Sequence, residues 1–170
     1  MLYRANVQAI FRYIFYRVSQ PALAEDLTGD VFIRALKGIG GYKDQGKPFI
    51  AWLYRIAHDR VVDHYRQQER QPETPLEDDL GTTQPDNMDA TLLRRQAAKA
   101  LRVAIAELTD DQQQVIILRF IEGQRVEAVA QVMGKNANAI KQLQHRALAA
   151  LARQLDKAGF DIETVLAGLV

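Results

Sequence analysis

The sequence predicts an all-α protein made of two small helical bundles joined by a flexible acidic linker. Apolar residues recur at spacings of three and four through most of the 170 residues, which is the period of a helix that packs on one face. Alternating runs of Val, Ile and Thr, which are typical of strands, are nearly absent, and glycine is concentrated at a few breaks. The length allows one domain or two small ones.

The distribution of charge divides the chain further. The formal net charge is only +1, but residues 1–70, 71–93, 94–155 and 156–170 carry net charges of +4, −6, +5 and −2. Two basic blocks separated by an acidic strip indicate two contacts with a polyanion and a linker that avoids it. We therefore expect a first domain over 1–70, a linker over 71–93, a second domain over 94–156 and a short tail over 157–170.

The first domain is expected to be a bundle of three or four helices, of which three can be placed. The first runs from Tyr3 to Val18, and the second starts at Pro21, which suits a first turn, with Ser19 as its cap. Glycines make residues 38–47 a loop, and a long third helix runs from Pro48 to about Glu69. The side chains expected to face the core of the second and third helices are Leu23, Leu27, Val31, Phe32 and Leu36, then Phe49, Trp52, Leu53, Ile56 and Val62.

The second domain follows a proline-rich acidic segment that we expect to be extended or disordered. Helicity resumes near Asp89 and runs to about Glu107, with Leu92, Leu93, Leu101 and Ile105 as core candidates. Thr109 or Asp110 caps the next helix, which Gly123 ends. A short helix over 126–133 and a long one over about 137–156 follow. An apolar stripe after Gly159 either packs on this domain or docks elsewhere.

Several classes of function are excluded by what the sequence lacks. There is no cysteine, so disulfides, thiolate zinc sites and a cysteine nucleophile are excluded. No apolar run approaches the roughly 20 residues of a membrane span, and the arginine-containing N-terminus does not have the pattern of a secretory signal. No phosphate-binding loop or nucleophile elbow is present. We expect a cytoplasmic protein that is not an enzyme and needs no cofactor.

The strongest local motif lies over residues 125–146. Two helices meet at Gly134, where a left-handed backbone is accessible to glycine, and the small Ala130 lets them cross closely. This is the helix-turn-helix pattern, whose second helix enters the DNA major groove. The outer face of that helix offers groups for base edges and phosphates, namely Asn136, Asn138, Lys141, Gln142, His145 and Arg146. The alternative is an ordinary helical hairpin with a solvated polar face.

The third helix and the loop before it mix aromatic and basic residues. Bases of single-stranded DNA stack on aromatic rings while cations follow the backbone, and a flipped base needs such a pocket. Trp52 taken alone is better explained as a core residue. A metal-dependent hydrolase is a rival interpretation of four nearby residues, His58, Asp59, Asp63 and His64. A solvated helix face explains these residues better.

Taken together, these motifs resemble the bacterial RNA polymerase sigma factors of the extracytoplasmic-function (ECF) group. The resemblance covers about residues 2–69 and 94–153. It rests on the order and spacing of the helix-turn-helix and three segments before it, AEDLTGDVFIRAL at 24–36, GKPFIAWLYRIAHDRVVDHYR at 46–66 and ELTDDQQQVIILRFIEG at 107–123.

The resemblance implies three sets of contact residues. A polymerase-binding helix would use Asp26, Leu27, Asp30, Val31, Arg34 and Ala35. Contacts to the melted minus-ten element would come from Tyr42, Lys43, Asp44, Lys47, Arg55, His58, Asp59, Val62 and Arg66. Contacts to the minus-thirty-five element would come from Arg119, Arg125, Lys135, Asn136, Ala137, Asn138, Lys141, Gln142, His145 and Arg146.

The chain departs from the family pattern at a few of these positions. Asp59 stands where asparagine is common in the family, and a carboxylate beside DNA phosphates is unfavourable. Its side chain therefore accepts a hydrogen bond from a base, turns away from the DNA or pairs with Arg55. Asn136 and Ala139 replace the usual Ser and Thr, and Leu143 replaces a frequent Arg. Asparagine caps a helix as well as serine does. These changes bear on the promoter sequence more than on the fold.

The implied partners are core RNA polymerase, through its β′ clamp helices and β flap, promoter DNA and an anti-sigma factor. The acidic linker would thread the active-site cleft and RNA exit channel of the polymerase as a mimic of nucleic acid, or serve only as a solubilising spacer. The other reading of the helix-turn-helix is a transcriptional regulator that acts without polymerase core, usually as a symmetric dimer on a palindrome.

Overall fold

Three helices build the N-terminal domain: α1 (Leu2–Val18), α2 (Pro21–Gly38) and α3 (Phe49–Arg70). The computed structural model describes residues 2–44, 46–70 and 88–169. Each of the three helices packs on the other two. Fully buried side chains from all three fill the space between them, including Ile10, Ile14, Leu27, Leu53 and Val61.

The start and end of α2 differ from expectation in two details. Gln20, not Ser19, is the N-cap, and it makes no side-chain cap hydrogen bond. Ser19 has a φ of 63°, so it forms the left-handed turn between α1 and α2, which makes the capping prediction wrong. At its other end α2 continues through Gly38 into the short 3₁₀ helix η1 (Ile39–Gly41), so the glycine-rich segment begins as helix.

The C-terminal domain contains α4 (Met88–Ala106), α5 (Asp110–Ile116), α6 (Val126–Met133), α7 (Ala137–Lys157) and α8 (Ile162–Ala167). Thr109 caps α5 in a capping box, because its side chain accepts from the Gln112 amide while the Gln112 side chain accepts from the Thr109 amide. The chain then widens into π-helical geometry over η2 (Ile117–Ile121), ahead of Gly123 with its φ of 66°. Apolar side chains of α5, η2 and α7 form the centre of this domain.

Helix α4 begins inside the range expected for the linker. The rest of that expectation, residues 71–87, lies outside the described residues. Leu92 and Leu93 on α4 are 53% and 63% exposed, so their prediction as core residues is wrong, whereas Leu101 and Ile105 are buried as predicted. Helix α8 packs on α4 and α7, so the tail joins its own domain.

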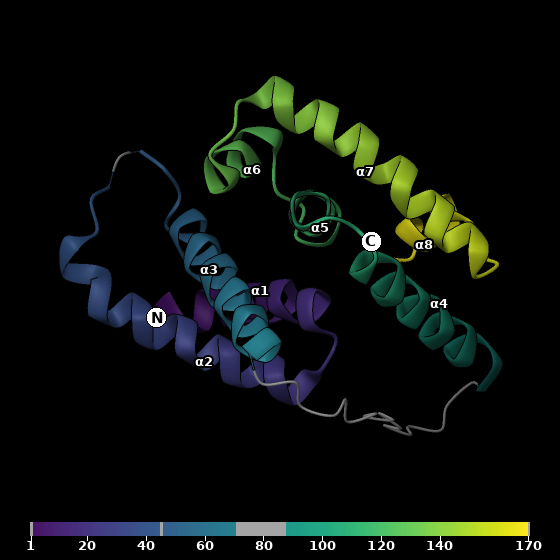
Figure 1. Cartoon of the computed structure of the whole chain (residues 1–170), viewed down its shortest axis with the longest axis horizontal. Helices are drawn as coiled ribbons and strands as arrows, with labels where there is room; N and C mark the ends of the chain where they lie inside the picture. The colour runs from purple at the N-terminus through teal and green to yellow at the C-terminus, as the bar shows by residue number, and fades with distance from the viewer. Residues whose placement is uncertain (1, 45, 71–87, 170) are drawn as a thin grey trace.

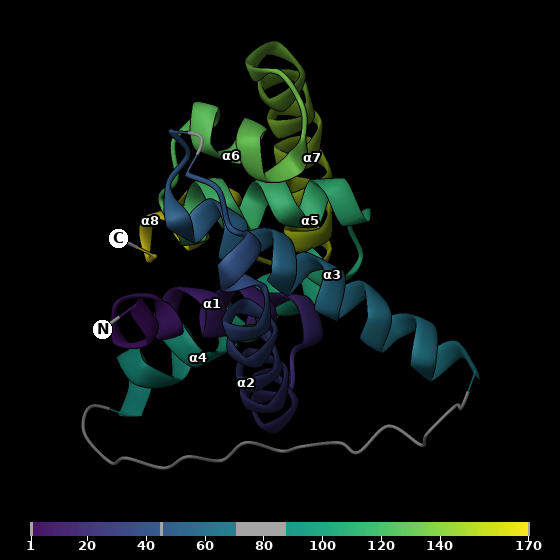
Figure 2. The same ribbon diagram turned by 90° about the vertical axis from the view of Figure 1, so that its left-hand side faces the viewer.

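The two domains lie against each other. Helices α1 and α3 face α4, η2 and α6, and α5 lies between the first three helices and α7 (Figures 1 and 2). Within the described ranges the protein is built of helices and turns without a strand. No helix in those ranges is long and apolar enough to cross a bilayer.

Candidate nucleic-acid interface

The turn between α6 and α7 has the geometry that its sequence predicts. Gly134 adopts φ 65° and ends α6 in the left-handed conformation, where its amide donates to the Ala130 carbonyl. Asn136 then caps α7 by accepting a 2.8 Å hydrogen bond from the Ala139 amide. Val129 and Ile140 are fully buried at the crossing of the two helices. These features form a helix-turn-helix with α7 as its second helix.

The outer face of α7 is accessible. Five of the predicted contact residues on it are exposed: Asn138, Lys141, Gln142, His145 and Arg146. The last four line one shallow depression along the helix. Amide side chains suited to base edges therefore lie beside cations suited to phosphates, as duplex recognition requires.

The other predicted contacts of this domain surround α7. Asn136 and Arg125 are exposed at the N-caps of α7 and α6. Lys135 is exposed in the turn, where its ammonium lies 3.5 Å from the Asp111 carboxylate, and Ala137 is half-buried.

Arg119 has a different environment, because it points into the domain. Its Nε donates to the Gln144 side chain over 2.9 Å, and its Nη1 donates to the Gln124 carbonyl over 2.6 Å. The guanidinium thus links the π-helical segment with α7 and with the turn before α6.

An aromatic cluster covers the N-terminal end of α3. The rings of Tyr42, Phe49 and Trp52 lie 4.9–5.5 Å apart between centroids. Tyr42 and Trp52, but not Phe49, line an open cavity of about 240 Å³, which is large enough for a single base. Its other lining residues include Lys43, Lys47, Arg55 and Gln131. The predicted Asp44 does not line it, since its carboxylate accepts the Gly46 amide over 3.0 Å and shapes the loop.

The predicted contact residues further along α3 separate into two groups. Asp59 and Arg66 are exposed and Val62 is half-buried, so these three remain on the surface of the N-terminal domain. Arg55 and His58 instead reach toward the C-terminal domain. Arg55 donates to the carbonyls of Gln131 and Val132 rather than pairing with Asp59.

Half of the predicted polymerase-binding residues on α2 are core residues. Leu27, Val31 and Ala35 are at most 5% exposed, because they form the stripe on which α2 packs, so the prediction that they contact a partner is wrong. Asp26 is exposed. Asp30 and Arg34 form ion pairs with α3, through Arg60 at 3.0 Å and Asp63 at 3.2 Å.

The sequence did not predict that α2 exposes an apolar surface. Ile33 and Leu36 are 52% and 72% exposed, although the periodicity placed Leu36 in the core. Helix α2 continues to Gly38, and the core ends at Ala35 one turn before it. An exposed leucine at the end of an amphipathic stripe gives no separate signal in a single sequence.

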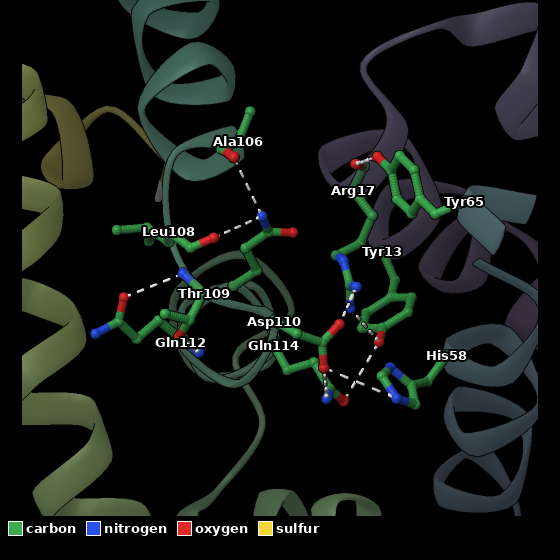
Figure 3. A network of polar contacts seen from close by, with 11 residues as sticks. Tyr13, Arg17, His58, Tyr65, Ala106, Leu108, Thr109, Asp110, Gln112 and Gln114 are labelled. Carbon is green, nitrogen blue, oxygen red and sulfur yellow. Dashed lines mark hydrogen bonds and ion pairs between the residues drawn. The ribbon is translucent and has the colours of Figure 1, made fainter. Parts of the chain in front are cut away.

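The sequence also did not predict the contacts between the two domains. Figure 3 shows the Asp110 carboxylate beside Arg17 and His58 of the N-terminal domain, with Gln114 next to it. Asp110 pairs with the Arg17 guanidinium, and its Oδ2 lies 3.8 Å from His58 Nε2. The Tyr13 hydroxyl donates to the Gln114 side chain over 3.4 Å. Burial raises the pKa of Tyr13 to about 12, so this hydroxyl keeps its proton at neutral pH.

Glu122 is the second carboxylate of the interface, and its side chain is only 2% exposed. It accepts from Arg12 Nε at 2.9 Å, from Arg12 Nη2 at 3.1 Å and from the Tyr54 hydroxyl at 3.2 Å. Burial and the nearby Glu122 charge raise the pKa of Tyr54. Because Glu122 directly follows an apolar run, a partner for its charge could have been expected, but not which one.

The histidines and acids on α3 do not form a metal site. Among the described residues, no three His, Asp or Glu side chains gather closely enough to hold an ion. Asp63 pairs with Arg34, and His58 faces Asp110.

Comparisons with known proteins agree with this architecture. The family model for sigma-70 region 2 matches residues 2–71, and the model for sigma-70 region 4 matches residues 98–151. The chain is 40% identical to the ECF RNA polymerase sigma factor BldN of Streptomyces coelicolor over 91% of its length, and it spans 59% of that relative. It is 30% identical to the RNA polymerase sigma factor YlaC of Bacillus subtilis, covering 92% of this chain and 91% of the relative.

A solved structure shares the fold. The sigma factor RpoE of Bartonella quintana, in complex with the anti-sigma factor NepR, superposes with a TM-score of 0.71 at 21% identity. The superposition covers 91% of this chain and 94% of that one.

Proposed function

The chain belongs to the ECF group of RNA polymerase sigma factors, and on that premise we propose that it directs core polymerase to promoters and opens them. Residues 1–70 would bind polymerase and the melted minus-ten element. Residues 94–156 would bind the minus-thirty-five duplex, with 71–93 as a linker and 157–170 as a tail that packs on the second domain.

The observation that carries this proposal is the pairing of two unlike DNA surfaces. The exposed polar and basic face of α7 suits the edges and phosphates of a duplex. The aromatic and cationic cavity at the start of α3 suits one unstacked base. A protein that has both surfaces can hold a duplex upstream while it stabilises separated strands downstream.

Strand opening in this mechanism is driven by binding energy alone. Tyr42 and Trp52 supply rings for stacking, and Lys43 and Lys47 supply charge for the adjacent phosphates. A captured base no longer competes for pairing, so the melted state gains the free energy of stacking, about 1–3 kcal/mol per base. Sigma factors are not enzymes, and we propose that this chain catalyses no step itself and acts in the cytoplasm.

The polymerase-binding surface is revised by the burial of α2. The exposed Asp26, Ile33 and Leu36 form an apolar patch with an acidic neighbour, which suits a basic coiled coil such as the β′ clamp helices. The apolar groove between α4 and α8 suits a helix of the β flap. The solved relative is bound to an anti-sigma factor, and an anti-sigma factor that covers these surfaces would inhibit this chain.

The proposal is tested by reconstituting the chain with bacterial core polymerase. We expect a complex in size-exclusion chromatography and permanganate-reactive, unpaired thymines on DNA enriched from a random library by that complex. Binding of duplex DNA by the chain alone, as a dimer on a palindrome and unaffected by core polymerase, would instead support an independent regulator.

A further inference from the structure

Gly38 is the last residue of α2, and its backbone does not require a glycine. Its φ of −93° and ψ of −6° are right-handed, so other residue types can adopt this conformation. The glycine that commonly ends a helix has a positive φ, as Gly134 has after α6, so termination of the helix does not explain Gly38. Glycine also weakens a helix relative to alanine. The reason for a glycine here must therefore lie in its surroundings.

The space that a side chain at Gly38 would need is filled by the indole of Trp52. A Cβ atom at Gly38 would lie 3.3 Å from Trp52 Cζ2 and 3.8 Å from Trp52 Cη2. Carbon atoms in favourable contact lie about 3.5–4.0 Å apart, so the indole would have to move by a few tenths of an ångström. At Gly40 and Gly41, in the turn that follows, an added Cβ would meet nothing within 4 Å. The absence of a side chain therefore matters at Gly38 and not at its neighbours.

Two aromatic rings hold the indole on other sides. The ring centroids of Tyr42 and Phe49 lie 4.9 Å and 5.5 Å from that of Trp52, and 5.4 Å from each other. Trp52 and Tyr42 line the cavity that we assign to an unpaired base, whereas Phe49 packs behind them and does not line it. The open cavity is thus the side on which the indole has room, and a side chain at Gly38 would push Trp52 toward it.

The position of the indole bears directly on base capture. Trp52 is half-buried, so packing accounts for only part of its surface, and it contributes to the wall of the cavity. Stacking depends steeply on distance, because a gap of about 0.5–1 Å already loses a quarter to a half of the dispersion energy. A displacement of a few tenths of an ångström would therefore change both the size of the cavity and the contact with a base.

We propose that Gly38 is a positioning residue for single-strand capture, because its missing side chain lets the Trp52 indole pack against the end of α2 in the orientation that stacks on a base. This inference rests on the proposed function and adds to it a residue that does not itself line the cavity. It acts through Trp52, so its effect on DNA requires the full indole ring.

The test combines one variant, one matched control and one rescue. Gly38→Ala adds the methyl group beside the indole. Gly40→Ala adds the same group two residues later in open space and is the control for the change in backbone freedom. Trp52→Phe is the background for the rescue, because phenylalanine lacks the Cζ2 and Cη2 atoms that a side chain at position 38 would meet.

The readout is fluorescence anisotropy of two DNA probes with the complex of each variant and core polymerase. One probe is a single-stranded DNA and the other a duplex, each enriched from a random library by the complex that contains the wild-type chain. Thermal unfolding of the free variants is measured in parallel, because a purely structural glycine would change stability and leave the choice between the two probes unchanged.

We expect Gly38→Ala to bind the single strand about tenfold more weakly than the wild type, which is about 1.4 kcal/mol and lies within the range for stacking of one base. Its duplex affinity should stay within about twofold. Gly40→Ala should change neither affinity. In the Trp52→Phe background, adding Gly38→Ala should change single-strand affinity by less than about twofold. An equal loss in both backgrounds, or no loss in the wild-type background, would overturn the proposal.

A second measurement needs no DNA. Trp52 is the one tryptophan of the chain, so the intrinsic fluorescence of the free protein reports on it directly. We expect Gly38→Ala to shift the emission to longer wavelength and to increase quenching by acrylamide, because the indole moves toward the open cavity, and Gly40→Ala to change neither. An unchanged spectrum in Gly38→Ala would overturn the displacement on which the proposal depends.

Failure of the proposed function would give a different result. If the complex with the wild-type chain enriches no single-stranded DNA, the proposed function fails. If it enriches such DNA and Gly38→Ala binds that DNA as tightly as the wild type does, only the role of Gly38 is overturned.

Discussion

Replacing Arg119 by methionine would show whether Arg119 supports helix α7 from inside the domain or contacts DNA directly. The Arg119 guanidinium donates to Gln144 on α7 and to the Gln124 carbonyl before α6. Methionine keeps the aliphatic length of the side chain and removes both hydrogen bonds. If Arg119 supports α7 from within the domain, the variant should bind DNA less well without losing a phosphate contact.

The size of the effect follows from these two hydrogen bonds. Hydrogen bonds from charged groups contribute about 1.5–3 kcal/mol each, and less where solvent competes. Arg119 is half-buried, so losing both should lower the free energy of unfolding of the C-terminal domain by about 2 kcal/mol. If the free energy of DNA binding fell by the same 2 kcal/mol or so, the affinity would drop by about thirtyfold, which is the upper limit of the effect.

The assay measures by fluorescence anisotropy how tightly the complex of the chain with core polymerase binds duplex DNA that this complex has enriched from a random library. The affinity is measured over a range of salt concentrations. Each phosphate contact contributes about 0.9 to the slope of log affinity against log salt. We expect Arg119→Met to lower the affinity and keep the slope, and Lys141→Met on the exposed face to lower the slope by about 0.9. A similar fall in slope for Arg119→Met would refute the supporting role, because the guanidinium would then bind phosphate.

Three further predictions test the fold and the polymerase surface. Gly134 has φ 65° and open space around it, so Gly134→Ala should lower the free energy of unfolding in urea by about 1 kcal/mol. The equally open Gly40, with an ordinary φ, is the control, and equal losses would contradict the left-handed turn. Because the pKa of Tyr13 is raised from 10 to about 12, the unfolded chain loses this proton first and stability falls as pH rises between those values. Tyr13→Phe should remove roughly 2–3 kcal/mol of that fall in urea titrations, and an unchanged pH profile would count against its burial. Leu36→Lys should weaken association with core polymerase at least about fivefold and leave thermal unfolding unchanged, whereas undiminished association would exclude the patch on α2.

The helices could be predicted closely from the sequence because their signals are local. The short helix α6 was predicted at its observed bounds, since an apolar periodic stretch ends at a glycine that adopts φ 65°. The helix-turn-helix and the exposed face of α7 followed from the same residues. Asn136 was correctly expected to replace serine as the cap, because its side chain reaches the Ala139 amide.

Contacts between distant segments could not be predicted. Leu92 and Leu93 fit an amphipathic helix, but periodicity shows only that they share a face, and the described residues leave both side chains more than half exposed. Arg55 was assigned to DNA from its place on α3, yet its guanidinium meets carbonyls 76 and 77 residues further along the chain. The pairing of Glu122 with Arg12 spans 110 residues. Such pairs depend on how the domains approach, which no local pattern records.

The proposed function gives core polymerase a choice of start sites. Its most direct test is transcription in vitro by purified core polymerase on a library of bacterial DNA, with the 5′ ends of the transcripts mapped with and without the chain. With the chain present, we expect a new set of start sites that share two sequence elements upstream. The same start sites with and without the chain would contradict it.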